Sequence, residues 1–101
     1  MATPFQPNPA KTVNIDVAAS SARVAIAGAP TSVRVMNNGT ATAWINFGDV
    51  TVTAVLETSM PVGPGVTEVL SFPNLTAATF YVAAIAAGST GKIYFTPGSG
   101  I

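Results

Sequence analysis

The sequence contains no cysteine and no histidine, and only 8% of its 101 residues are charged. The missing cysteine excludes disulfides, thiolate catalysis and thiolate-bound metals. The missing histidine removes the commonest general base and the commonest metal ligand. The four carboxylates stand singly, at Asp16, Asp49, Glu57 and Glu68. These absences predict a protein that is not an enzyme, with no catalytic residue, no metal site and no cofactor.

Charge of either sign is scarce, since typical soluble domains carry roughly 25% charged residues. Four basic and four acidic residues give a formal net charge of zero. A neutral, charge-poor surface tends to associate, because net charge helps to keep proteins apart. We therefore expect a surface largely covered by neighbours; the alternative is a stable sandwich with an uncharged polar face. The basic residues are scattered, which argues against nucleic-acid binding.

The sequence also lacks a long apolar run. Its longest continuous apolar part, residues 80–87, is far shorter than the roughly 20 residues that a membrane-spanning helix needs. The N-terminus does not have the basic-then-apolar pattern of a secretion signal. We expect no membrane partner and synthesis in the cytoplasm.

Residues 1–11 are rich in proline, with Phe5 among Pro4, Pro7 and Pro9. Proline fixes its own φ angle and biases the preceding residue towards extended geometry. We predict an extended arm at residues 1–11, with Phe5, Pro7 and Pro9 contacting a neighbouring subunit. The alternative is a disordered tail, which is common at chain termini.

The remaining residues, 12–101, show short apolar alternations separated by glycine, proline and asparagine turns. Residues 12–17 alternate cleanly, as in a half-buried strand. Further strands are expected at residues 23–27, 51–56, 66–72, 80–86 and 92–96, with a rigid loop at 60–65 and a loose tail at 97–100. With the two strands described next, this predicts one all-β domain: an antiparallel β-sandwich of about eight short strands, jelly-roll-like, with no helix.

The clearest local signal lies in residues 32–53, where two alternating stretches flank Asn37-Asn38-Gly39. This pattern predicts a β-hairpin, because Asn-Gly between alternating stretches is the strongest short hairpin signal. The loop would contain two residues, Asn38 and Gly39, or three if Thr40 joins them.

The loop length decides where Trp44 lies, because a slip of one residue turns a whole strand over. A two-residue loop places Val33 opposite Trp44, and a three-residue loop places Val33 opposite Ile45. We favour the longer loop, since it buries Ile45 and Phe47 with the valines. The outward residues of the two strands, expected to contact a partner, are then Arg34, Met36, Trp44 and Asn46.

Three stretches carry a family resemblance: VRVMNNGTATAWINFGD, MPVGPGVTEVLSF and YVAAIAAGSTGKIYFTPGSGI. The pattern to which they belong extends over nearly all of the chain after Ala22. They resemble short structural proteins encoded among the virion-assembly genes of tailed bacteriophages. The motifs consist of strands and turns and contain no catalytic site.

The resemblance implies a structural virion component, most similar to a capsid decoration (cement) protein on the capsid surface. Its partners would then be the major capsid protein and itself, as a dimer or trimer. The alternative is a receptor- or carbohydrate-binding module of a phage tail or head fibre. In that case Trp44, Tyr81 and Tyr94 would form a platform on which sugars stack.

Overall fold

The computed structural model describes residues 6–7, 9–26, 32–71, 80–88 and 90–99. In these residues the chain forms nine strands in two antiparallel sheets, and its one helical element is a short 3-10 turn, η1 (Pro9–Lys11). The all-β antiparallel class predicted from the sequence is confirmed. Within the described residues, no helix is long and apolar enough to cross a membrane.

The first sheet, sheet A, is built around the long strand β9. Strand β4 pairs with one side of β9, while β2 and the short β1 lie in tandem on its other side. Strand β7 pairs with the far side of β4. The bounds are β1 (Gln6–Pro7), β2 (Val13–Val17), β4 (Ser32–Asn37), β7 (Thr67–Ser71) and β9 (Gly91–Ser99).

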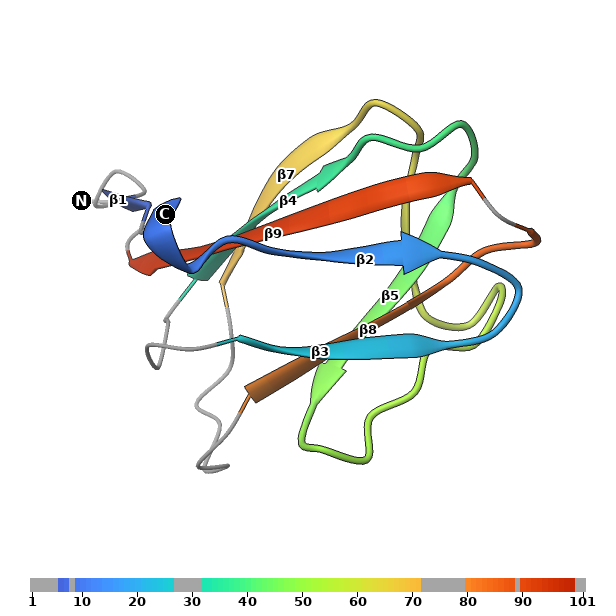
Figure 1. Cartoon of the computed structure of the whole chain (residues 1–101), viewed down its shortest axis with the longest axis horizontal. Coiled ribbons are helices and arrows are strands. Elements are labelled where there is room, and N and C mark those ends of the chain that lie inside the picture. Colours follow the sequence, from blue (N-terminus) through green and yellow to red (C-terminus); the bar gives the residue numbers. More distant parts are fainter. Residues whose placement is uncertain (1–5, 8, 27–31, 72–79, 89, 100–101) are drawn as a thin grey trace.

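The second sheet, sheet B, has the strand order β3-β8-β5-β6. Its strands are β3 (Ala22–Ile26), β5 (Ala43–Gly48), β6 (Met60–Val62) and β8 (Phe80–Ile85). From β2 to β9, consecutive strands lie in different sheets with one exception, the pair β5 and β6. Figure 1 shows β2, β9, β4 and β7 side by side, with β3, β8 and β5 forming the other layer.

One apolar core joins the two sheets, because each strand turns alternate side chains inward. Val33, Val35, Val82, Ile93 and Phe95 have no exposed surface. Each buried valine, isoleucine or phenylalanine contributes roughly 1.5–3 kcal/mol. The buried core residues are Ile15, Val17, Ile26, Val33, Val35, Ala43, Ile45, Val62, Phe80, Val82, Ala84, Ala86, Ile93 and Phe95.

The predicted hairpin at residues 32–53 is wrong, because β4 and β5 do not pair. Strand β4 pairs with β7 and β9 in sheet A, and β5 pairs with β6 and β8 in sheet B. Neither proposed register occurs, and residues 38–42 cross from one sheet to the other. The prediction of the buried side nevertheless holds: Val33 and Ile45 both face the core, and Trp44 lies on the outer side of β5.

Asn37 explains why the Asn-Asn-Gly segment crosses between sheets. Its side chain is fully buried and fully paired: Nδ2 donates to the carbonyls of Ala41 (3.0 Å) and Val62 (2.9 Å), and Oδ1 accepts from the amide of Gly39 (2.9 Å). Its backbone amide donates to the Val66 carbonyl. One side chain thus connects the end of sheet A to β6 of sheet B.

Gly39 is required by a close approach of two chain segments. A Cβ at this position would lie 2.7 Å from the Thr90 carbonyl oxygen. The amide of Thr40 donates to the same carbonyl at 2.8 Å. Gly91 approaches from the other segment with φ +116°, and a Cβ there would lie 3.1 Å from the Gly39 Cα. The β4–β5 and β8–β9 connections therefore pack together through backbone.

Four other segments differ from the sequence prediction. Residues 51–56 form no strand, residues 60–62 are strand β6 and not part of a loop, and residues 97–99 belong to β9 and not to a tail. In the N-terminal segment, Gln6 and Pro7 pair with Ser99 and Gly98 of β9, and residues 9–11 turn helically, so the segment is not extended throughout. The strand prediction failed at residues 51–56 and 97–99 because strand pairing depends on segments distant in the chain. It failed at β6 because Pro61 suggested a loop.

Candidate interaction surfaces

The outer face of sheet A is an open surface of mostly uncharged side chains. Strand register places Asn14, Tyr94, Met36 and Thr67 in one row across β2, β9, β4 and β7. The adjacent row contains Thr96, Arg34 and Val69, and Thr12 bonds Thr96 hydroxyl to hydroxyl at 3.0 Å. We call Arg34, Met36, Val69 and Tyr94 the Arg34 face.

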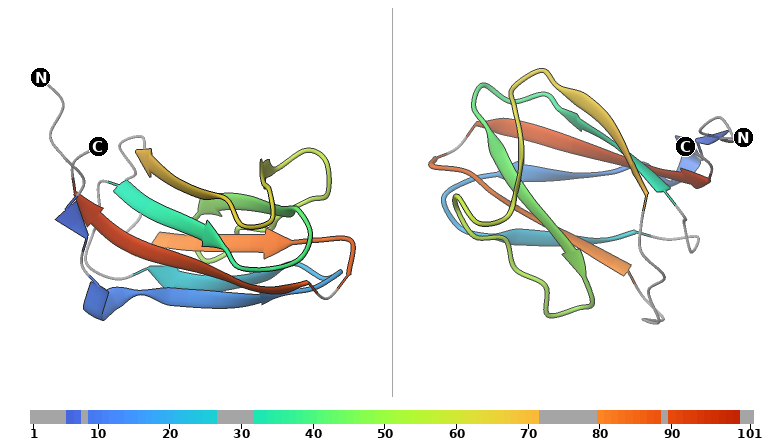
Figure 2. Two further views of the ribbon diagram at one scale, coloured as in Figure 1. Left: turned by 90° about the horizontal axis from the view of Figure 1, so that it is seen from above. Right: turned by 180° about the vertical axis from the view of Figure 1, so that it is seen from behind.

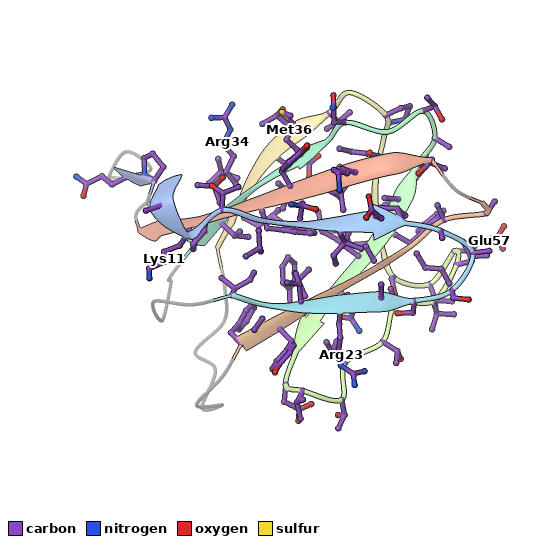
Figure 3. The ribbon with its side chains drawn as sticks, in the orientation of Figure 1. Lys11, Arg23, Arg34, Met36 and Glu57 are labelled. Atoms are coloured by element: carbon purple, nitrogen blue, oxygen red, sulfur yellow. The ribbon has the colours of Figure 1, made fainter. Side chains whose placement is uncertain are left out.

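Arg34 is the charged residue of this face, and its side chain is exposed. Within the described residues it makes no hydrogen bond and no ion pair. Met36 and Tyr94 beside it are half-buried, so each presents apolar surface next to the guanidinium. Figure 3 shows Arg34 and Met36 projecting from the same side of the sheet. The face thus combines one unpaired cation with apolar surface.

A second charged group on the outer face of sheet A, Lys92 of β9, is already paired with Asp16 of β2. Lys92 Nζ lies 2.8 Å from Asp16 Oδ1 and 3.3 Å from Asn14 Oδ1. The hydrogen bond with Asp16 raises the pKa of Lys92 above its usual value. Both side chains are well exposed, so solvent screens the pair and it stabilises the fold only weakly. Lys92 and Asp16 are thus already paired with each other, unlike Arg34, which has no such partner within the described residues.

The outer face of sheet B is partly covered by residues 49–59, which we call the covering segment (Figure 2). Its residues Val52 and Ala54 pack on Ala83 of β8, which has no exposed surface. The amide of Ala54 bonds Ser21 Oγ at 2.9 Å. The alternation in residues 51–56 therefore reflects burial against the outside of a sheet, without strand pairing.

A tight turn at Asp49 begins the covering segment. Asp49 Oδ1 accepts from the amide of Thr51 at 2.8 Å and from its hydroxyl at 2.6 Å. These bonds, led by the hydroxyl, lower the pKa of Asp49 below 3.8. The carboxylate is thereby used in a local turn, because aspartate side chains typically bond the backbone two residues further on.

Trp44 lies on the part of sheet B next to the covering segment. Register places it between Pro61 of β6 and Ile85 of β8, on the outer side of the sheet. We call these three residues the Trp44 row. Trp44 and Ile85 are half-buried and Pro61 is exposed, and none is charged. The row is an apolar strip bounded by the covering segment, on which Ile85 also packs.

The structure divides the residues predicted to contact one partner. Arg34 and Met36 lie together on sheet A, whereas Trp44 and Asn46 lie on the opposite outer face, on sheet B. A single patch of these four residues is therefore excluded. Asn46 is also engaged within the chain, since its Nδ2 donates to the Thr53 carbonyl at 3.1 Å. It holds the covering segment in place.

The predicted arm contacts are only partly described. Pro7 is exposed and lies in β1, paired with β9 of its own chain. Phe5 and the side chain of Pro9 lie outside the described residues. Of the three arm residues, the described part of the chain therefore places only the side chain of Pro7.

The aromatic platform suggested for sugar binding is also divided. Tyr94 lies on the outer face of sheet A, while Trp44 and Tyr81 lie on the outer side of sheet B. Tyr81 packs against the cluster beneath the covering segment. The three rings cannot stack on one ligand. Among the described residues, no group of three carboxylates could hold a metal ion.

Sequence reasoning missed Tyr94 and Val69 as companions of Arg34, and it missed the covering segment. The pairs Met36–Tyr94 and Arg34–Val69 join strands far apart in the chain. No local pattern encodes such pairs. The covering segment carried one usable signal, the Gly48-Asp49 pair at its start, which is typical of a turn.

No family model, no curated protein and no solved structure matches this chain.

Proposed function

We propose that this protein is a structural component of a tailed-bacteriophage virion, a decoration protein that binds the capsid lattice and stabilises it. The sequence motifs resemble such proteins, and the charge-poor composition suits a protein covered by neighbours. On this proposal the partners are the major capsid protein and further copies of this chain, and the site is the capsid surface. The protein acts through contact area and has no catalytic role.

We further propose that the sandwich is a jelly roll. The orders β2-β9-β4-β7 and β3-β8-β5-β6 support this, because eight strands wind through two sheets and all consecutive pairs but one change sheet. Jelly rolls occur in viral capsid and lectin domains, so the fold agrees with a virion role without establishing it. The N-terminal residues 1–11 form an arm in this proposal, with Phe5 as its anchor on a neighbour.

The observation that carries the proposal is the Trp44 row. A half-buried tryptophan between a proline and an isoleucine, on an outer face, has the features of an interface anchor. It would bury apolar surface against the capsid with no charge to desolvate. Repetition of one modest contact over a symmetric lattice then gives tight overall binding.

Counting the copies per purified particle tests the proposed location. A decoration protein is expected on the order of hundreds of copies, since it follows the symmetry of the lattice. About a dozen copies would instead indicate a tail or vertex appendage, because those positions have low symmetry. Quantitative mass spectrometry against the major capsid protein provides the ratio.

Binding of purified variants to particles that lack the protein tests the Trp44 row itself. Trp44→Ala is expected to weaken particle binding while the melting temperature changes little. Arg23→Ala is the matched control, because Arg23 is exposed on the same outer face but on β3, outside the row. Equal binding of Trp44→Ala and the wild type would contradict the assignment of the row.

A further inference from the structure

The tip of the covering segment, residues 55–59, is an exposed, hydrogen-bonded turn. The Ser59 amide donates to the Val55 carbonyl at 3.1 Å, and the Val55 amide donates to Ser59 Oγ at 2.9 Å. These two bonds close the turn at its base. Leu56, Glu57 and Thr58 are all exposed beyond it. The two hydrogen bonds that close the tip are therefore both made within the tip itself.

Glu57 occupies this tip with a left-handed backbone, at φ 70°. Among the described residues it is the one non-glycine residue with positive φ. That conformation costs a side-chain-bearing residue energy, which glycine would avoid. The Glu57 carboxylate has no hydrogen bond or ion pair within the described residues. No contact within the described residues accounts for a glutamate at this strained position, which points to a use outside the chain.

Apolar surface is concentrated near the same tip. Val55 is 53% exposed and Leu56 39% exposed. Of the five large hydrophobic residues exposed in the described part of the chain, four lie in residues 50–60. The tip thus presents one anion with apolar side chains beside it. The Arg34 face presents one cation with apolar side chains beside it, so the two surfaces carry opposite charge and similar apolar surroundings.

We propose that the tip of one copy docks on the Arg34 face of a second copy. Glu57 would pair with Arg34, while Val55 and Leu56 would pack on Met36 and Tyr94. Within the described residues neither charge has a partner, and each is flanked by apolar surface, which gives complementary charge and complementary chemistry.

This contact is head-to-tail, because tip and face are different parts of the molecule. Figure 3 shows Glu57 at one end of the long axis and Arg34 towards the other. Such heterologous contacts close into rings when the rotation between copies allows it. The inference goes beyond the proposed function and does not depend on it, since isolated protein can form the contact without a capsid.

Charge reversal tests the contact in purified protein by sedimentation velocity over a range of concentrations. Arg34→Glu and Glu57→Arg are each expected to weaken association by about tenfold or more, since each places like charges together. The double variant Arg34→Glu/Glu57→Arg restores the pair in the opposite sense and should recover wild-type association. Arg23→Glu is the matched control for the change in net charge.

Leu56→Ser adds a variant that leaves both charges in place. It is expected to weaken association through lost apolar contact alone, with thermal unfolding close to wild type. A wild-type protein that is monomeric at every concentration overturns the proposal, as does a double variant no better than the single ones. Particle binding is measured separately: wild-type protein that self-associates but does not bind particles would count against the proposed function and not against this contact.

Discussion

The hydrogen bonds of the Asn37 side chain should contribute strongly to the stability of the fold. Asn37→Ala removes three bonds, to the backbone of Ala41, Val62 and Gly39. Each contributes roughly 1 kcal/mol, and a fully enclosed group left without a partner costs more. Val62 is almost completely buried, whereas Ala41 and Gly39 are half-buried and water can replace their bonds. We expect a loss of about 2–4 kcal/mol in the free energy of unfolding.

This loss translates into a large change in melting temperature. Unfolding entropy near 2.1 cal/mol/K per residue, for 101 residues, makes 1 kcal/mol correspond to about 5 °C. The variant should therefore melt about 10–20 °C below the wild type. Urea unfolding followed by circular dichroism and by Trp44 fluorescence measures the free energy directly, with an unchanged slope expected if the transition remains two-state.

Two further variants separate the hydrogen bonds from simple loss of volume. Asn38→Ala is the neighbouring control: Asn38 is exposed and its side chain makes no bond within the described residues, so it should stay within about 0.5 kcal/mol of wild type. Asn37→Asp keeps the shape but turns a carboxylate towards two carbonyl oxygens. At neutral pH it should be at least as unstable as Asn37→Ala.

Acidification should reduce the instability of Asn37→Asp relative to Asn37→Ala, because protonation of the introduced carboxylate gives it one hydrogen-bond donor. The folded state favours the protonated form, so the stability of Asn37→Asp relative to Asn37→Ala should rise as the pH falls. A loss below about 0.5 kcal/mol for Asn37→Ala would refute the reasoning, because surface substitutions have effects of that size. A pH-independent difference between the two variants would show that the donors do not matter.

Three other predictions concern single positions. Gly39→Ala should destabilise the fold clearly, since its Cβ would meet a backbone oxygen at 2.7 Å. Chemical denaturation should show a larger loss in the free energy of unfolding than for Gly63→Ala, whose Cβ would meet only a valine methyl at 3.3 Å. Glu57→Gly should raise the melting temperature slightly, because relief of the left-handed backbone strain outweighs the added freedom of the unfolded chain. The same change should weaken self-association, because it removes the carboxylate. A lower melting temperature would argue against the strain. The pKa of Asp49 measured by NMR should lie below 3.8. The lowered pKa in the folded state contributes stability at pH values above the unfolded pKa, and this contribution is lost as the pH falls through the folded pKa. The free energy of unfolding of Asp49→Asn should therefore differ from that of the wild type at neutral pH and converge with it in acid.

Local patterns predicted more about the faces of strands than about their partners. Alternation identified Ile15 and Val17 as inward and Asn14 and Asp16 as outward, and the structure agrees. The same reasoning placed Trp44 on an outer side although the hairpin behind it was wrong. The period of two along a strand depends on the strand alone, so it survives an error in pairing.

Partner residues on a surface could not be predicted in this way. Arg34 and Met36 were expected beside Trp44 because a hairpin would have joined their strands. Long-range pairing with β9 puts Tyr94 beside Met36 instead. Asn46 had the alternation of a surface residue, yet it bonds the covering segment. Which polar residues stay free for a partner depends on what the rest of the chain lays across each sheet.

The sequence by itself determined the all-β class, which side of most strands faces the core and which faces outward, and a surface with few charges. These properties follow from residue types and their spacing within a few positions. Tertiary structure alone decided that Asn37 and Gly39 join two sheets instead of closing a hairpin, and that the two outer faces differ. Those outcomes rest on contacts such as Asn37 with Val62 and Gly39 with Thr90. Only the folded chain brings such distant residues together.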